Sequence, residues 1–364
     1  MNKHYRKLET SAALVPLREV GTEVALPAEL LKRAKGYASK SRSERTLKEY
    51  ARCWKQFGKW CDRNQRDDLP ASTETLVGYI TWMAAGQDNG KSVATSTIAQ
   101  AFAAIKFRHK SKGYLINSDT PELQAVLAGV RREIAKTRGI RRVAALTFDK
   151  LQDILNLLNP EKARDARDGA ILALGCGAAL RRSELVGLDW AEHGQGTGFV
   201  TSDDKGLTVT LMTSKASQDA AETVAIPRAD APLMCSIVED WVKSGQIKKG
   251  SPLFRTVGNR MSQKVGETRL DARSVPRIVK RRVYEMIKSQ NKGKKKLTTE
   301  EARALTEMFA GHSMRVGFVT SAAERNMATH KIQQQTRHKT AAMVNVYVRE
   351  VDKFKNSALK GVGF

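Results

Sequence analysis

The first 136 residues contain four stretches with the periodicity of amphipathic helices and no convincing strand. In residues 43–61, apolar side chains recur at spacings of three and four, and Ser43 can cap the first turn. Pro121 fits the first position of another helix, behind Thr120 as its cap. The stretches are residues 43–61, 72–85, 92–113 (with a basic end that includes His109) and 119–136. This pattern restricts the first part of the chain to a helical bundle.

A change of sequence character follows the bundle. Residues 137–146 combine a glycine with three arginines, and a helical pattern restarts behind Thr147. Because 364 residues exceed what one core usually covers, two domains are expected. The predicted parts are an N-terminal arm at 1–27, the bundle at 28–136, a linker at 137–146, a second domain at 147–347 and a tail at 348–364.

The second domain is predicted to be mainly helical with a small antiparallel sheet. The apolar run 169–180 indicates a buried helix. Two alternating β-rich runs around a polar turn, within 206–227, predict a hairpin. Helices resume near residue 231, and the lysine-rich stretch 288–301 indicates a solvated loop. The fold class is therefore mainly α.

The formal net charge of +25 concerns the partners of the protein rather than its fold. Nucleic acid is the leading candidate, and an anionic membrane surface is the second. The longest apolar run is too short to span a bilayer, and the N-terminus lacks the apolar core of a signal peptide. The four cysteines form no CxxC pair, which favours reduced thiols, a cytoplasmic setting and no zinc site.

A set of cationic residues in the second domain, followed by a tyrosine, is the strongest functional signal. Each member alone has an ordinary interpretation: a solvated or locally paired arginine, a lysine at a turn, a half-buried tyrosine. The conjunction is far less expected by chance. Its members are Arg181, Lys215, His312, Arg315, His338 and Tyr347, with Glu184 beside the first arginine. Such a set suits a phosphodiester and has no obvious use on a neutral substrate.

The chemistry of these residue types indicates a covalent reaction. Arginines bind phosphate oxygens through paired bonds that strengthen as charge builds in the transition state. Nearby cations favour the phenolate of a tyrosine, and a lysine on a hairpin could protonate the departing oxygen. No acidic cluster able to hold Mg²⁺ accompanies the set. We therefore expect no metal and no cofactor.

The order Arg, Lys, His-x-x-Arg, His, Tyr resembles the catalytic domain of tyrosine recombinases, the phage integrase family. The segments SERTLKEYARCWKQFGKWCDRN, GHSMRVG and VNVYVRE are similar to motifs of its Cre-like branch. The resemblance covers roughly residues 40–355. It implies a helical DNA core-binding domain and a catalytic domain that together form a C-shaped clamp around DNA.

The resemblance also implies a role for each residue of the set. Arg181, His312 and Arg315 become catalytic, His338 takes a position filled by His or Trp, and Tyr347 becomes the nucleophile. Glu184 becomes the supporting acid of Arg181. Lys215 becomes the general acid, with Lys205 as an alternative on the same hairpin. The chain has Ala179 and Arg337 at two positions where family members commonly have glycine.

DNA contacts outside the active site follow from the same resemblance. The helix at 92–113 and the segment 270–282 would face major grooves, and linker arginines would follow phosphates. The candidates are Gln100, Lys106, Arg108, Arg138, Arg141, Arg142, Arg273 and Arg277. Arg273 is the best candidate for a base contact, because arginine reading guanine is the commonest specific contact.

The expected function is site-specific recombination of double-stranded DNA through a 3′-phosphotyrosyl intermediate, without metal or ATP. The expected partners are a site with inverted repeats and further copies of the chain, as a tetrameric synapse on DNA and a monomer in solution. The tail at 348–364 would dock on a neighbouring protomer or pack on its own domain. Two rival functions are a type IB topoisomerase and a non-catalytic DNA-binding accessory factor.

Overall fold

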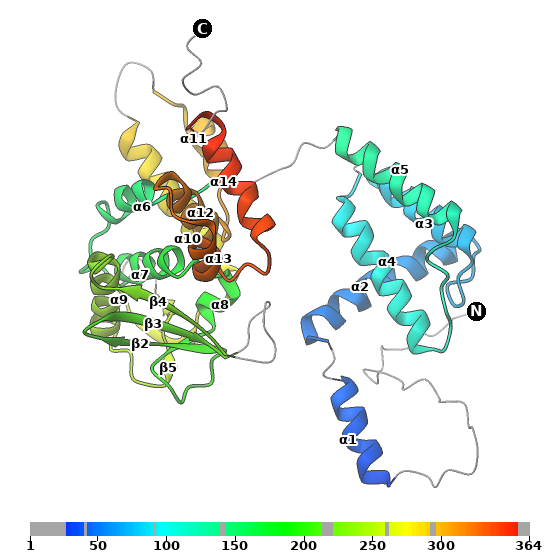
Figure 1. Ribbon diagram of the computed structural model, residues 1–364, viewed down its shortest axis with the longest axis horizontal. Coiled ribbons are helices and arrows are strands. Elements are labelled where there is room, and N and C mark those ends of the chain that lie inside the picture. The colour runs from blue at the N-terminus through cyan, green and yellow to red at the C-terminus, as the bar shows by residue number, and fades with distance from the viewer. Residues whose placement is uncertain are drawn as a thin grey trace. The chain divides into compact units, whose positions relative to one another are not determined.

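The computed structural model describes residues 27–39, 42–90, 92–137, 143–212, 221–258, 262–291 and 296–355. The chain divides into two units, residues 1–141 and 142–364 (Figure 1). Within the described residues, no helix is both long and apolar enough to cross a membrane. All four cysteines are buried and unpaired.

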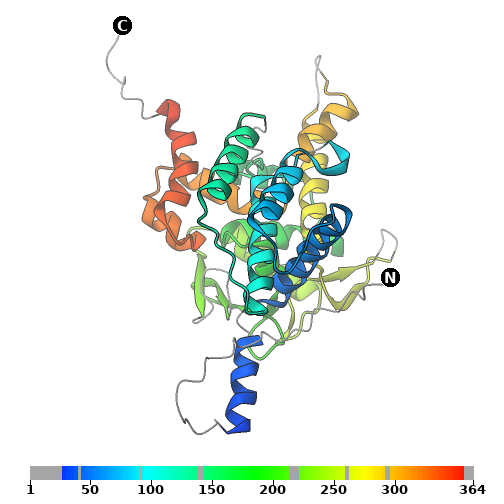
Figure 2. The ribbon, with the colours of Figure 1, turned by 90° about the vertical axis from the view of Figure 1, so that its right-hand side faces the viewer.

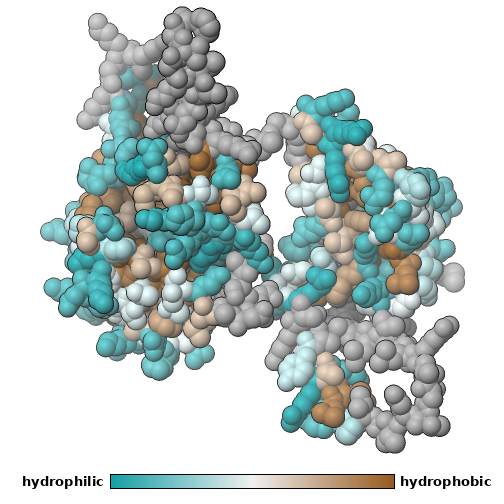
Figure 3. All heavy atoms as spheres, in the orientation of Figure 1, coloured by the Kyte–Doolittle hydropathy of each residue, from teal (hydrophilic) through white to brown (hydrophobic). Residues whose placement is uncertain are grey.

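The described part of the first unit is helical, as the sequence predicts. The helices are α1 (Ala28–Ser39), α2 (Glu44–Arg63), α3 (Thr73–Ala84), α4 (Thr95–Ser111) and α5 (Pro121–Thr137), with a 3-10 turn at Gln87–Asn89. Ser43 caps α2 as expected, because its hydroxyl accepts the backbone N–H of Thr46 at 3.2 Å. Helix α1 was not predicted, and it leaves Leu30 and Leu31 exposed. Figure 3 shows apolar (brown) atoms on the surface of this helix.

Aromatic rings of α2 and α3 contribute to the core of this unit. Figure 2 shows its helices, drawn from blue to blue-green. The Tyr79 ring lies 5.0 Å from Phe57 and 5.5 Å from Trp60, centroid to centroid, both at steep angles. Edge-to-face contacts of this kind are favourable because the positive ring edge meets the negative ring face. The helical periodicity of residues 43–61 therefore arises from packing.

His109 belongs to this core rather than to a basic surface. It is 1% exposed. Its Nε2 accepts the N–H of Ala71 at 2.9 Å, and its Nδ1 lies 2.9 Å from the carbonyl of Ile105. Burial lowers the pKa of His109, so the ring is neutral at pH 7 and donates from Nδ1. The basic end predicted for this helix therefore excludes His109.

The second unit is a mostly helical domain with a small sheet, in agreement with the predicted fold class. Its helices are α6 (Phe148–Leu155), α7 (Ala163–Gly177), α8 (Arg182–Val186), α9 (Pro232–Ser244), α10 (Ser274–Gln290), α11 (Thr299–Glu307), α12 (Ser313–Glu324), α13 (Thr329–Thr336) and α14 (Ala341–Lys355). Its strands are β1 (Leu188–Trp190), β2 (Gly198–Asp203), β3 (Gly206–Leu211), β4 (Glu222–Pro227), β5 (Ser251–Pro252), β6 (Arg255–Val257) and β7 (Val265–Arg269).

The larger sheet has the strand order β4-β3-β2-β1-β5. The predicted hairpin is confirmed: β3 and β4 pair antiparallel, with Leu211 opposite Glu222 and Gly206 opposite Pro227. The sequence did not predict the other strands, of which β1 and β5 have only three and two residues.

Helix α7 is the buried helix that the apolar run predicts, and its residues from Arg167 to Gly177 are all buried. It packs against α9, which also covers β3 and β4 (Figure 1). Gly175 permits a close approach of α12, since a Cβ there would lie 2.6 Å from the sulfur of Met314. The C-terminal end of α7 therefore meets α12, the helix of the His-x-x-Arg motif.

Candidate active site

Backbone carbonyls at and just after the C-terminal end of α7 hold several residues of the site in place. Helix ends leave carbonyls without intrahelical partners, and three consecutive ones here accept bonds from side chains far along the chain. The bonds run from Gln335 to Gly177 (2.9 Å), from Arg337 to Ala178 (3.2 Å) and from Arg315 to Ala179 (2.8 Å). The negative end of the helix dipole also favours the two guanidiniums. The last helical turn thus positions residues from α12 and from the end of α13.

Ala179 follows this turn in the left-handed backbone region, with φ +47. Arg337 has φ +55. Glycine adopts these angles at no steric cost, whereas a Cβ crowds the following carbonyl. The two positions where the chain departs from glycine are therefore positions of real backbone strain.

We expect Ala179→Gly to be less destabilising than Ala178→Gly by about 1–2 kcal/mol, the strain of a non-glycine residue in this region. Both alanines are fully buried, so both variants lose a methyl group, but Ala178 has φ −93. Denaturant unfolding of the two variants measures the difference. Equal destabilisation would show that Ala179 bears no strain.

Arg181 is held by the first acidic residue after it. Arg181 is the N-cap of α8, and its Nη1 donates to Glu184 Oε1 at 2.5 Å. Glu184 Oε2 accepts the Arg181 backbone N–H at 2.9 Å and Nη2 of Arg337 at 3.0 Å. Burial opposes ionisation of Glu184, but these bonds and the two guanidinium charges outweigh burial and lower its pKa. The Glu184 carboxylate is therefore charged and shared between two arginines.

Arg315, in the first turn of α12, is 1% exposed. Its Nη1 donates to the carbonyl of Ala179, but its buried Nη2 has no hydrogen-bond partner among the described residues. Burial, followed by the charges of Arg181 and Arg337, lowers its pKa to about 9, although Glu184 and the phenol of Tyr347 act in the opposite direction. Arg315 is thus a buried cation with a free donor, which is costly unless an anion binds it.

The two histidines of the set are neutral at pH 7. Burial, then the charges of Arg315 and Arg181, lowers the pKa of His312, the N-cap of α12. Burial and the surrounding cations lower the pKa of His338 to about 4.

Thr336 orients the ring of His338. The Thr336 hydroxyl lies 2.7 Å from His338 Nδ1 and 2.7 Å from the carbonyl of Ile332. A carbonyl only accepts, so the arrangement that makes both bonds has the hydroxyl donating to Ile332 and Nδ1–H donating to the hydroxyl. Nε2 of the neutral ring then carries a lone pair.

Tyr347 lies on α14 and is half-buried. Its ring packs against a small cluster that includes Val319, Ile332 and Val344, from α12, α13 and α14. The structure thus brings Tyr347 into the group formed by Arg181, Glu184, His312, Arg315 and His338. Helix α14 continues to Lys355, beyond the predicted start of the tail.

Lys215 lies outside the described residues, in the connection between β3 and β4. The alternative, Lys205, is exposed in the turn between β2 and β3. It lies at the Gly206–Pro227 end of the β3–β4 pair, whereas the Glu222 end contacts Arg337. Six residues of strand rise about 20 Å, so Lys205 is at the wrong end of the hairpin. This geometry argues against Lys205.

The candidate DNA-contacting residues of the first unit lie on α4. Gln100 and Lys106 are exposed, and Lys106 donates to the hydroxyl of Ser118 at 3.0 Å. Arg108 is half-buried, with its guanidinium 5.8 Å from the ring centroid of Trp54. The linker arginines Arg138, Arg141 and Arg142 lie outside the described residues.

In the second unit, Arg273 and Arg277 are exposed at the start of α10. Arg273 donates from Nε and Nη2 to the carboxylate of Asp271 at 3.1 and 3.0 Å. At the other side of α10, Arg282 is buried and donates to the fully buried Asp168 of α7 at 2.8 Å. Helix α10 is therefore anchored to α7 while its first arginines remain exposed.

No role was predicted for four residues that hold this group together, although Arg337 was noted as a departure from glycine. Gln335, Thr336 and Arg337 adjoin His338, and their place before a candidate catalytic histidine is a usable signal. Glu222 makes an ion pair with Arg337, at 3.7 Å from Nε to Oε2. It had no signal in the sequence, because its position depends on the pairing of β3 with β4.

Comparisons with known proteins identify the family of this chain. The model of the phage integrase family matches residues 144–353. A relative described as an integrase/recombinase xerD homolog, from Selenomonas ruminantium, is 32% identical over 334 residues, which cover 90% of this chain and 88% of the relative.

Two solved structures share the fold. XerH site-specific recombinase bound to palindromic difH substrate aligns with a TM-score of 0.54 at 12% identity, covering 92% of this chain and 86% of that one. The Tn1549 transposon integrase in complex with circular intermediate DNA aligns with a TM-score of 0.51 at 14% identity, covering 88% and 92%.

The fold and the family match define an enzyme that cuts and rejoins DNA strands. The chain belongs to the phage integrase family and is a site-specific tyrosine recombinase. The comparisons do not distinguish the Cre-like branch within this family.

Proposed function

We propose that Tyr347 is the nucleophile of this recombinase. Its oxygen attacks the phosphorus of one DNA phosphodiester, the bond to the 5′ oxygen breaks, and the 3′ end becomes a phosphotyrosine. Reversal by a 5′ hydroxyl of another strand rejoins the backbone. Neither step consumes ATP, because the energy of the phosphodiester is kept in the ester with Tyr347.

The observation that carries this proposal is the buried Nη2 of Arg315, which has no hydrogen-bond partner in the described part of the chain. An anionic oxygen of the scissile phosphate would satisfy this donor, and Arg181 would bind the phosphate from the turn before α8. Both contacts strengthen in the transition state, because negative charge builds on the oxygens bound to phosphorus. The low local dielectric increases their effect relative to water.

Two proton transfers accompany the exchange. The proton of Tyr347 goes to a neutral imidazole, and His312 and His338 are the candidates. The departing 5′ oxygen takes a proton from Lys215. The Lys215 assignment rests on the resemblance to the family motif.

The DNA partner is proposed to be a duplex with inverted repeats, bound by α4 of the first unit and by the start of α10 in the second. Arg273 is oriented by Asp271, which takes its Nε and Nη2 and leaves Nη1 free for a guanine. Free, buried thiols fit a reducing compartment, so the proposed setting is the cytoplasm.

Assembly into a tetramer on DNA is also part of the proposal, with a monomer in solution. The tail at 348–364 would dock on the next protomer, and head-to-tail exchange closes a ring. Cooperative filling of a duplex with two half-sites tests this point. Undiminished cooperativity after deletion of residues 353–364 would argue for a tail that packs on its own subunit.

Salt dependence tests how the net charge of +25 is used. We expect the logarithm of the binding constant to fall with the logarithm of salt concentration with a slope of about −6 or steeper, because a clamp on a duplex releases many counterions. Titration of a duplex selected from a random pool gives the slope. A slope shallower than about −3 would contradict extensive phosphate contact.

A further inference from the structure

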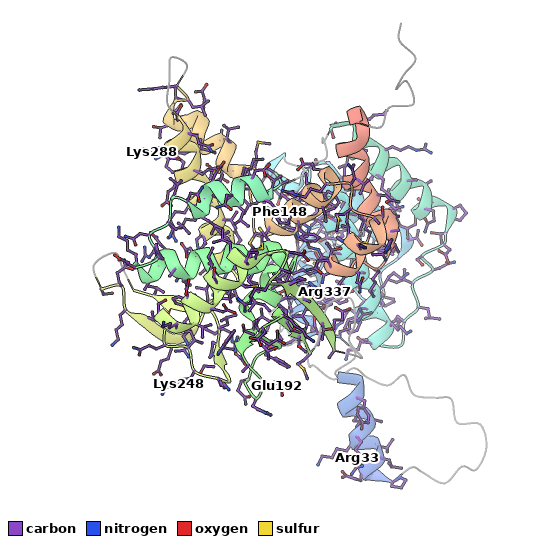
Figure 4. The ribbon with its side chains drawn as sticks, turned by 60° about the vertical axis from the view of Figure 1, so that its left-hand side comes forward. Arg33, Phe148, Glu192, Lys248, Lys288 and Arg337 are labelled. Atoms are coloured by element: carbon purple, nitrogen blue, oxygen red, sulfur yellow. The ribbon has the colours of Figure 1, made fainter. Side chains whose placement is uncertain are left out.

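We propose that Arg337 is a positioning residue for strand cleavage, acting through Glu184 and Glu222. The inference rests on the proposed role of Tyr347. Arg337 lies where α13 ends, between the C-terminal helices and the sheet (Figure 4). It contacts three other parts of the unit: Ala178 at the end of α7, Glu184 in α8 and Glu222 at the start of β4.

Arg337 makes two hydrogen bonds through Nη1 and Nη2, and its Nε makes an ion pair but no hydrogen bond among the described residues. Nη1 donates to the carbonyl of Ala178 at 3.2 Å, and Nη2 donates to Glu184 Oε2 at 3.0 Å. Nε faces Glu222 Oε2 at 3.7 Å. The Arg337 side chain is 5% exposed, so these contacts are made away from bulk water. A lysine could not reproduce them, because its single ammonium lacks the planar fork.

Sharing of Glu184 is the first consequence. The carboxylate binds Arg181 through Oε1, and Arg337 takes part of its remaining charge at Oε2. Arg181 is therefore held in place by Glu184 without being fully neutralised. A guanidinium that keeps some positive charge stabilises the charge at phosphorus better than a fully paired one.

Attachment of β4 is the second consequence. Glu222 is the first residue of β4 and directly follows the segment that carries Lys215. Its Oε2 is buried and has no hydrogen-bond partner among the described residues, so Arg337 is the cation that compensates it. Arg337 thus links the start of β4 to Glu184, the acid that holds Arg181.

The strained backbone at residue 337 indicates that the arginine side chain there has a function. With φ +55, glycine would be the less strained residue there. The chain accepts this strain and buries a guanidinium, which is costly unless its partners are in place. Three substitutions separate these effects. Arg337→Gly relieves the strain and removes the cation, Arg337→Gln removes the cation alone, and Arg337→Lys keeps a charge without the fork.

Single-turnover cleavage measures the effect, with a nicked duplex chosen by selection from a random pool. We expect Arg337→Gln and Arg337→Gly to slow adduct formation by about tenfold or more, as expected for misplaced reacting groups, with Arg337→Lys in between. Binding of the duplex stays within about twofold of wild type, since no proposed DNA contact is lost. Arg325 is an exposed arginine at the C-terminal end of α12. Arg325→Gln is therefore the matched control, and this variant should cleave as wild type does.

Glu222→Gln tests the ion pair between Glu222 and Arg337. We expect this substitution to slow adduct formation less than Arg337→Gly does. The double variant should be no more than about twofold slower than Arg337→Gly alone, because both changes break one interaction. If the two losses multiplied, Glu222 would not act through Arg337.

The pH profile separates positioning from simple stability. Arg337 is one of several positive or protonatable groups that face His338, and their loss raises the pKa of that ring. These groups are Arg181, His312, Arg315 and Arg337. Loss of Arg337 also raises the pKa of Glu184. Both shifts move the acid limb of the cleavage rate of Arg337→Gln to higher pH, whereas mere loss of folded protein lowers the rate equally at every pH.

The outcomes distinguish this inference from the function on which it rests. If wild type cleaves and Arg337→Gly cleaves equally fast with the same pH profile, the positioning role is wrong and the nucleophile is unaffected. If the rates of all variants fall only in proportion to folded protein, the positioning role is also wrong. If wild type forms no adduct on any selected duplex, the proposed role of Tyr347 fails, and the role of Arg337 fails with it.

Discussion

Tyr347→Phe is expected to abolish formation of the covalent protein–DNA adduct while leaving duplex binding within about twofold of wild type. The substitution removes one oxygen, and that oxygen is the atom proposed to attack phosphorus. The ring keeps its packing against Val344 and Ile332, so folding is preserved. Denaturing gels of a nicked duplex incubated with each protein measure the adduct.

Tyr284→Phe is the matched control, because Tyr284 lies on α10 and has no place in the proposed reaction. It should form as much adduct as wild type. Normal adduct with Tyr347→Phe would remove this tyrosine from the mechanism, whatever the effect of the control.

Arg315→Ala is expected to slow cleavage on the order of 10²-fold or more, the scale found when one donor to a developing oxyanion is lost. Its Nη2 is a buried donor without a hydrogen-bond partner among the described residues. Arg315→Lys keeps a positive charge, but its single nitrogen cannot occupy the positions of both Nη1 and Nη2, so we expect its cleavage rate to remain well below wild type. Single-turnover cleavage of the nicked duplex gives both rates.

Stability must be measured alongside these rates, since Arg315 is buried and Arg315→Ala leaves a cavity beside Ala179. Arg315→Lys fills most of that space. A folded Arg315→Lys variant that cleaves at the wild-type rate would mean that the planar guanidinium of Arg315 is not required for binding the phosphate.

The helices could be predicted where packing gives the sequence a period. Ser43 marks the start of α2, and the apolar run before Arg181 marks α7, because a fully buried helix must be apolar throughout. Strands β1 and β5 could not be predicted, since two or three residues show no alternation. The buried state of His109 was also hidden, because it depends on the chain near Ala71 folding back to satisfy the ring.

The candidate site was also only partly predictable from the sequence. The resemblance pointed to Arg181, His312, Arg315, His338 and Tyr347, and the structure brings them into one group. Their catalytic roles remain predictions, and Lys215 lies outside the described residues.

What holds the group together could not be read from the sequence. The carbonyls of α7 that accept from Gln335, Arg337 and Arg315 are backbone atoms, which leave no trace in the residue types. Glu222 reaches Arg337 only through the register of β3 with β4. Such contacts arise from tertiary structure, and no local pattern encodes them.

Identification of the covalently modified residue is the most direct test of this account. The adduct formed by wild type on a nicked, selected duplex is trimmed with nuclease, digested with protease and sequenced by mass spectrometry. We predict a nucleotide joined through its 3′ phosphate to Tyr347, in the peptide that contains residues 340–348. A nucleotide on another residue, or one attached through a 5′ phosphate, would contradict the proposed reaction.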